Sequence, residues 1–104
     1  MNLDNFDKEL LKHISMIPGV YGFADLNSKN ENLEKKHITK KNEWYKAISK
    51  IQHSNEIIIN LAVVILFSVN TQTIVKEISS LVEFYTKKNN FKLKALNIHI
   101  KGVS

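Results

Sequence analysis

The longest apolar stretch of the chain, residues 57–69, carries no charged side chain and is rich in β-branched residues. Polar turn residues bound it on both sides, which favours a strand over a buried helix. Because its apolarity is nearly continuous, we expect both faces of this strand to be covered, as in a central strand of a sheet. Each large side chain buried there is worth about 1.5–3 kcal/mol, so this strand is expected to dominate the core.

Apolar residues at spacings of three and four predict a first helix over residues 4–17, with Asn2 or Asp4 as its cap. Its apolar stripe is expected to pack on the domain's own sheet. Residues 20–26 then alternate as a short strand, in which Gly22 indicates a bulge or a close backbone approach.

A hairpin is predicted from residues 44–52 and 56–68, with its turn at residues 53–56. Trp44 and Tyr45 would open the first of these strands. Their rings could form a stacking platform for a nucleic-acid base, but packing at the edge of the sheet is the favoured interpretation.

A second helix is predicted from about residue 72 to 90, capped by Asn70 or Thr71, and it is followed by a last strand at residues 93–103. A strand, a helix and a strand in succession predict a parallel crossover. The fold class is therefore α+β, a two-layer sandwich in which two helices cover one face of a mixed four-stranded sheet, in the order α-β-β-β-α-β.

Residues 27–42 are polar, rich in lysine and long for a connection inside a compact domain. They are interpreted as a loop, although Ser28 and Glu31 have the spacing of a capping box and leave open a short helix over residues 31–37. A solvated loop is the favoured interpretation, and contact with an anion or a partner is the alternative. The candidate contact residues are the lysines of the densest basic cluster, Lys35, Lys36, Lys40 and Lys41.

The chain has 104 residues, which indicates a single domain over residues 1–104, and it has no cysteine, which excludes disulfides and thiolate metal sites. The apolar run at 57–69 is shorter than the roughly 20 residues of a membrane-spanning helix, and no secretory signal is recognised, so a cytoplasmic location is expected. The formal net charge is +5, but every basic residue is lysine and none is arginine. This composition weakens the case for specific nucleic-acid binding, which favours arginine.

No catalytic or metal site is expected from the sequence. The histidines, at positions 13, 37, 53 and 99, lie on different predicted elements without the spacing of metal ligands. His99 is expected to face away from the apolar row of the last strand. The glycines form no phosphate-binding loop, and no serine has an adjacent base. We therefore expect no enzymatic activity and no cofactor.

Residues 96–103 read Leu-Asn-Ile-His-Ile-Lys-Gly-Val, and residues 14–20 end in Ile-Pro-Gly-Val. The first motif resembles the characteristic close of the alkaline-shock protein family of bacterial envelope-stress proteins, and the second is similar to the end of that family's first helix. The order strand, turn, amphipathic helix and strand over residues 57–103 is similar as well. The resemblance implies a non-enzymatic cytoplasmic protein linked to cell-envelope homeostasis, in some members recruited to the inner face of the membrane by a protein partner.

Two binding hypotheses follow. The first is a structural or interaction protein that acts through self-association or through a membrane-associated protein partner. The alternative is an RNA- or DNA-binding module that uses the basic cluster. A small-molecule enzyme stays as a third hypothesis only because one sequence does not reveal a pocket.

Overall fold

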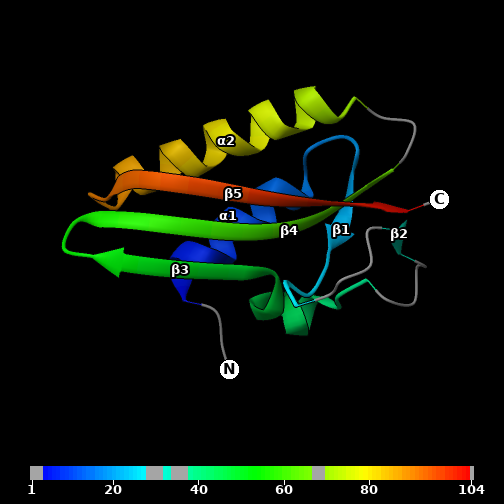
Figure 1. Cartoon of the computed structure of the whole chain (residues 1–104), viewed down its shortest axis with the longest axis horizontal. Helices are drawn as coiled ribbons and strands as arrows, with labels where there is room; N and C mark the ends of the chain where they lie inside the picture. The colour runs from blue at the N-terminus through cyan, green and yellow to red at the C-terminus, as the bar shows by residue number, and fades with distance from the viewer. Residues whose placement is uncertain (1–3, 28–31, 34–37, 67–69, 104) are drawn as a thin grey trace.

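The apolar stretch that dominates the sequence forms β4 (Glu56–Leu66), and three other strands pair with it. The structure, a computed structural model, describes residues 4–27, 32–33, 38–66 and 70–103 (Figure 1). β5 (Lys92–Val103) runs parallel to β4 on one side. On the other side β3 (Ile48–His53) pairs antiparallel with the first half of β4 and β1 (Val20–Phe23) with the second half.

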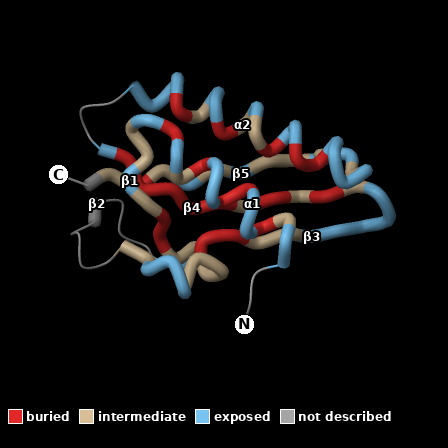
Figure 2. Tube along the Cα trace, turned by 180° about the vertical axis from the view of Figure 1, so that it is seen from behind, coloured by how far each residue is buried: buried red, intermediate tan, exposed pale blue. Residues whose placement is uncertain are grey.

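The two predicted helices, α1 (Asn5–Ser15) and α2 (Thr71–Lys88), lie on one face of this sheet (Figures 1 and 2). Asp4 caps α1, since its carboxylate accepts a hydrogen bond from the Asp7 N–H at 2.8 Å. Asn70 caps α2 in the same way, by accepting from the Thr73 N–H at 3.3 Å. The predicted α+β sandwich, with both helices on one face of a mixed sheet, is confirmed.

The polar segment 27–42 contributes a short fifth strand, β2 (Asn32–Leu33), which pairs parallel with Gly102 and Val103 at the end of β5. The prediction of a short helix over residues 31–37 is therefore wrong for Asn32 and Leu33, which lie in a strand. The other residues of that range lie outside the described residues. The sequence could not reveal this pairing because its partner residues lie far away in the chain.

The predicted first strand of the hairpin begins later than expected. Trp44 and Tyr45 lie in a 3-10 helix, η2 (Lys41–Ala47), and β3 starts only at Ile48. Within η2 the Lys46 ammonium is 2.6 Å from a Glu43 carboxylate oxygen, a contact between residues three apart that the 3-10 turn brings onto one side. The turn between β3 and β4 lies where the sequence predicted it, with Ser54 in the left-handed region at a φ of 57°.

The main core lies between the helices and the sheet. Its largest fully buried side chains from the helices and from β4 are Leu10, Leu11, Ile14, Ile59, Leu61, Val63, Ile78 and Val82.

A second, smaller cluster lies on the opposite face of the sheet. There Leu26 and Ile38 pack against buried Ala62 and Val64 of β4. The first half of β4 is not covered in this way, since Ile58 is only partly buried on that face. The expectation of cover on both faces thus holds for the second half of β4 alone (Figure 2).

Candidate interaction surfaces

Within the described part of the chain, no three histidine, aspartate or glutamate side chains form a group that could hold a metal ion. His53 and His99 are exposed, and His99 lies on the face opposite the helices, as predicted. His13 of α1 is exposed as well, and its Nδ1 lies 2.7 Å from the Tyr85 hydroxyl of α2. His37 lies outside the described residues.

The structure describes only half of the predicted basic cluster. Lys40 and Lys41 are exposed at the start of η2, whereas Lys35 and Lys36 lie outside the described residues. Nearby Lys46 is engaged by Glu43, and their hydrogen bond lowers the pKa of the Glu43 carboxyl and raises the pKa of the Lys46 ammonium. The two exposed cluster lysines that the structure describes thus precede an ion pair that is itself partly exposed.

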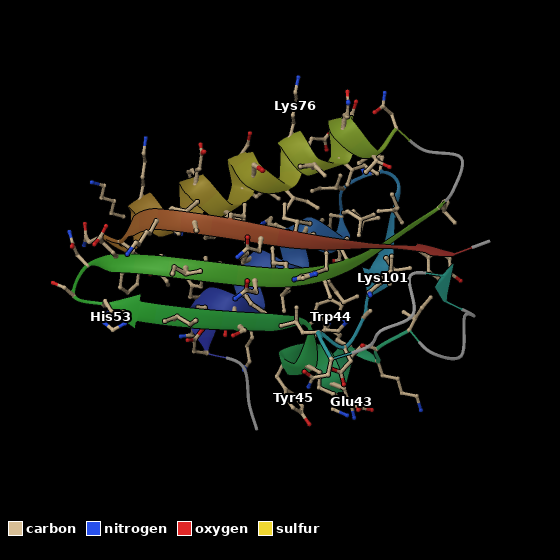
Figure 3. The ribbon with its side chains drawn as sticks, in the orientation of Figure 1. Glu43, Trp44, Tyr45, His53, Lys76 and Lys101 are labelled. Carbon is tan, nitrogen blue, oxygen red and sulfur yellow. The ribbon has the colours of Figure 1, made fainter. Side chains whose placement is uncertain are left out.

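The aromatic pair in η2 does not form an open stacking platform. The Trp44 ring packs edge-on against the Phe23 ring, with centroids 4.8 Å apart, and it adds to the main core. Tyr45 points away from the sheet (Figure 3) and is half-buried. The favoured interpretation, in which Trp44 packs against the sheet, agrees with this geometry.

A charged cluster that sequence reasoning missed joins α1 to β3. The Lys50 ammonium lies 2.6 Å from Asp4 Oδ2 and 3.1 Å from Asp7 Oδ1, and it sits 4.8 Å from the centre of the Phe6 ring. Burial raises the pKa of Asp7 even though Lys50 acts in the opposite direction. Burial tends to raise the pKa of Asp4 as well. The contacts with Lys50 and the hydrogen bond from the Asp7 N–H outweigh the effect of burial, so the pKa of Asp4 is lowered. Such a contact between residues 46 positions apart leaves no signal in a sequence pattern.

The outer surface of the two helices carries an exposed apolar area. Met16, just after α1, is 68% exposed, and Phe84 of α2 is 59% exposed. Two shallow hollows lie beside them, with volumes of about 460 and 330 Å³, and Leu81 lines both. We call this area the helix patch, and its apolar members at the surface are Met16, Pro18, Leu81 and Phe84, beside the buried Ile17 of the core.

The helix patch could have been suspected from the sequence. Both Met16 and Phe84 fall outside the apolar stripes that place their helices on the sheet. A large apolar residue off the stripe of an amphipathic helix is predicted to face solvent.

The face of the sheet opposite the helices is mostly polar over its first half. Asn97 of β5 donates a side-chain hydrogen bond of 2.9 Å to Asn60 of β4, which pairs with Ser49 of β3. Ile51 of β3, which pairs with Ile58, is exposed on the same face. Further along β5, Lys101 (labelled in Figure 3) is buried. The local sequence pattern did not predict a buried lysine at this position. This face offers polar contacts but no convergent set of acid, base and nucleophile among the described residues.

No family model, no curated protein and no solved structure matches this chain. The resemblance to the alkaline-shock family therefore stays a prediction, and function is argued from the surfaces of the molecule itself. Among the helices that the structure describes, none combines the length and the apolarity needed to cross a membrane.

Proposed function

We propose that this chain is a non-enzymatic interaction protein of the envelope-stress type. It acts in the cytoplasm or at the inner face of the membrane, through self-association or through a membrane-associated protein partner. The observation that carries the proposal is the helix patch, in which Met16 and Phe84 expose most of their apolar surface beside hollows lined by Leu81. Contiguous exposed apolar surface with polar residues at its rim is characteristic of protein–protein contact.

The composition of the patch supports a protein contact over a small-molecule site. Its hollows are shallow, and their polar lining includes Glu77, Ser80 and His13 without any arrangement that would activate a substrate. Apolar contacts of this kind are not weakened by salt, in contrast to contacts between charges.

Light scattering after size-exclusion chromatography, at low and at high salt, tests self-association. We expect a salt-insensitive dimer or larger assembly that Phe84→Glu dissociates. The matched control is Ile51→Glu, which places the same charge at an exposed apolar residue on the opposite face of the sheet. Equal behaviour of the two variants contradicts a role for the helix patch in self-association.

Photo-crosslinking in cells tests whether the helix patch contacts a membrane-associated protein partner. A photoreactive residue at position 84 is expected to crosslink either a second copy or a protein of the membrane fraction, identified by mass spectrometry. The same residue at position 51 serves as the control. If position 84 yields no product, or yields the same products as position 51, the proposed interaction function is rejected.

Nucleic-acid binding is the alternative function, and one observation favours it: Lys40 and Lys41 are both exposed at the start of η2. The partly buried Trp44 packs against Phe23, so its ring is less available for the aromatic contact with a base that would accompany them. RNA and DNA binding at about 50 mM salt, where phosphate contacts are strongest, is the test. Binding that is lost when Lys35, Lys36, Lys40 and Lys41 are all changed to alanine would favour this alternative.

A further inference from the structure

β5 has an outer edge that is largely unpaired among the described residues. β4 pairs with one side of β5 along its whole length, whereas β2 pairs with the other side only at Gly102 and Val103. Over residues 92–101 the outer edge therefore presents backbone N–H and C=O groups without a described strand beside them (Figure 1). Such an edge is a site where another extended chain can pair.

The two faces of this edge differ in chemistry. The row on the helix side is apolar and packs against the main core: Leu93, Leu96, Ile98 and Ile100. The row on the opposite side is mostly polar, with a lysine at each end, and we call it the basic row: Lys92, Ala95, Asn97, His99 and Lys101, of which Lys101 is buried. Lys94 is the extra residue where the register between β4 and β5 shifts, and its side chain is exposed.

A hollow lies beside the first part of this edge, on the helix side. Glu83, Thr86 and Lys87 of α2 line it together with Phe91, Lys92 and Leu93, and its volume is about 470 Å³. The Thr86 hydroxyl is already satisfied, since it donates a hydrogen bond of 2.9 Å to the Glu83 carbonyl oxygen. Its lining is mixed, and within it Phe91 and Leu93 offer the apolar contact that suits an apolar side chain of an added strand.

We propose that this edge binds an extended peptide segment of a partner protein, in which apolar and acidic side chains alternate. Alternation places every apolar side chain on the helix side, toward the hollow, and every acidic side chain on the other side. There the acidic groups lie beside Lys92, next to the exposed Lys94 at the register shift, and the backbone of the segment pairs with β5. The inference rests on the proposed role as an interaction protein and gives that role a second surface, separate from the helix patch.

Charge favours such a segment over a second copy of this chain. In an antiparallel pair of β5 strands related by a two-fold axis, the basic row of one copy lies beside the basic row of the other. Like charges on paired strands are destabilising, and each copy also carries a formal net charge of +5. An acidic strand removes both penalties.

The test uses the full chain and a peptide in which valine and glutamate alternate, acetylated at its N-terminus and amidated at its C-terminus. At about 3.4 Å per residue, a peptide of about eight residues is long enough to lie along residues 92–98. Fluorescence anisotropy measures binding, and amide hydrogen exchange maps it. We expect the wild-type protein to bind the peptide and its amide hydrogens within residues 92–98 to exchange more slowly in the complex. The double variant Lys92→Glu with Lys94→Glu should bind the peptide about fivefold to tenfold more weakly. The same double variant should bind the corresponding valine–lysine peptide better than the wild type does.

The matched control is Lys8→Glu with Lys76→Glu, which makes the same change in net charge at exposed lysines on the helices. Lys76 points away from the sheet (Figure 3) and should leave peptide binding unchanged. Strand pairing is tested by peptides that are N-methylated on all valines or on all glutamates, because alternate N–H groups of a strand point to opposite edges. One of the two should keep binding and the other should lose it.

Several results overturn the proposal. They are equal binding of the two N-methylated peptides, equal affinity for the glutamate and lysine peptides, and protection that maps to β3 or to the helix patch. Concentration-dependent protection of residues 92–98 without peptide would assign the edge to a second copy instead. A failure of peptide binding in a protein whose assembly still depends on Phe84 rejects the edge proposal and leaves the proposed function standing.

Discussion

Gly22 of β1 lies so close to Ile38 that a Cβ atom at position 22 would come within 2.9 Å of Ile38 Cγ2. The pairing of β1 with β4 also shifts register between Val20 and Gly22. The bulge that the glycine indicated in the sequence is present, and the group that approaches the glycine closely is a side chain. The contact fixes segment 38–40 over the second, smaller cluster, where the Thr39 N–H donates to the Phe23 carbonyl oxygen at 2.9 Å.

We expect Gly22→Ala to destabilise the fold by about 1–2 kcal/mol, measured by urea unfolding, because the new methyl group meets a branched and rigid side chain. Without the clash, the same change would stabilise the folded protein by about 0.4–1 kcal/mol, because alanine lowers the conformational entropy of the unfolded chain. The double variant Gly22→Ala with Ile38→Ala is the control. It should be more stable than the sum of the two single changes predicts. Full stability of Gly22→Ala alone would contradict the close contact.

Lys50→Met should destabilise the protein in a pH-dependent manner, because it leaves the largely buried Asp7 without its cation. At about pH 7 the expected loss is about 1–2 kcal/mol, less than for a fully buried pair since Lys50 is partly exposed to solvent. Burial already raises the pKa of Asp7 above its ordinary value of 3.8, and loss of Lys50 raises it further. The folded variant therefore takes up a proton as pH falls, and the deficit shrinks toward about pH 4.

Chemical unfolding at the two pH values measures this deficit. Asp7→Asn added to Lys50→Met should recover stability at neutral pH, because it removes the uncompensated charge. The control Lys46→Met breaks an exposed pair with Glu43 and should produce no resolvable change. A deficit of Lys50→Met that does not depend on pH would contradict the ion cluster.

Tyr85→Phe removes the hydroxyl that lies 2.7 Å from His13 Nδ1 between α1 and α2, and we expect it to cost about 1 kcal/mol of stability. Burial, together with the charge of Glu9, raises the pKa of Tyr85 above its ordinary value of 10.0. In the wild type Tyr85 should thus ionise late, above its ordinary value, in an ultraviolet titration, and stability should fall as the pH rises above 10. In Tyr85→Phe the late step should be absent, whereas Tyr45→Phe should retain it.

Val63→Asp should unfold the domain, because Val63 is 0% exposed in the middle of β4. An unpaired charge there costs several kcal/mol, comparable with the whole stability of about 5–15 kcal/mol of a small domain. Ile51→Asp, at a residue that is 48% exposed on the neighbouring strand, is the matched control and should remain folded by circular dichroism. A folded Val63→Asp variant would show that the core is assigned wrongly.

The sequence determined those features that follow from local periodicity and local hydrogen bonding. Alternation and apolarity over residues 57–69 located β4, and spacings of three and four located α1 and α2, because strand and helix each impose their own repeat on a chain. The cap of each helix was one of the two residues the sequence offered, since a capping side chain bonds within its own first turn. The resemblance, the function and the partner lie beyond what these patterns determine.

The tertiary structure alone decided the contacts between distant residues. It placed Trp44 in a 3-10 helix, where the ring packs on Phe23, although the local pattern favoured a strand. It also joined Lys50 to Asp4 and left residues 92–101 of β5 without a described outer partner. These outcomes depend on which strands meet and which side chains fill the same space, and the free energy of such contacts arises only when the whole chain packs.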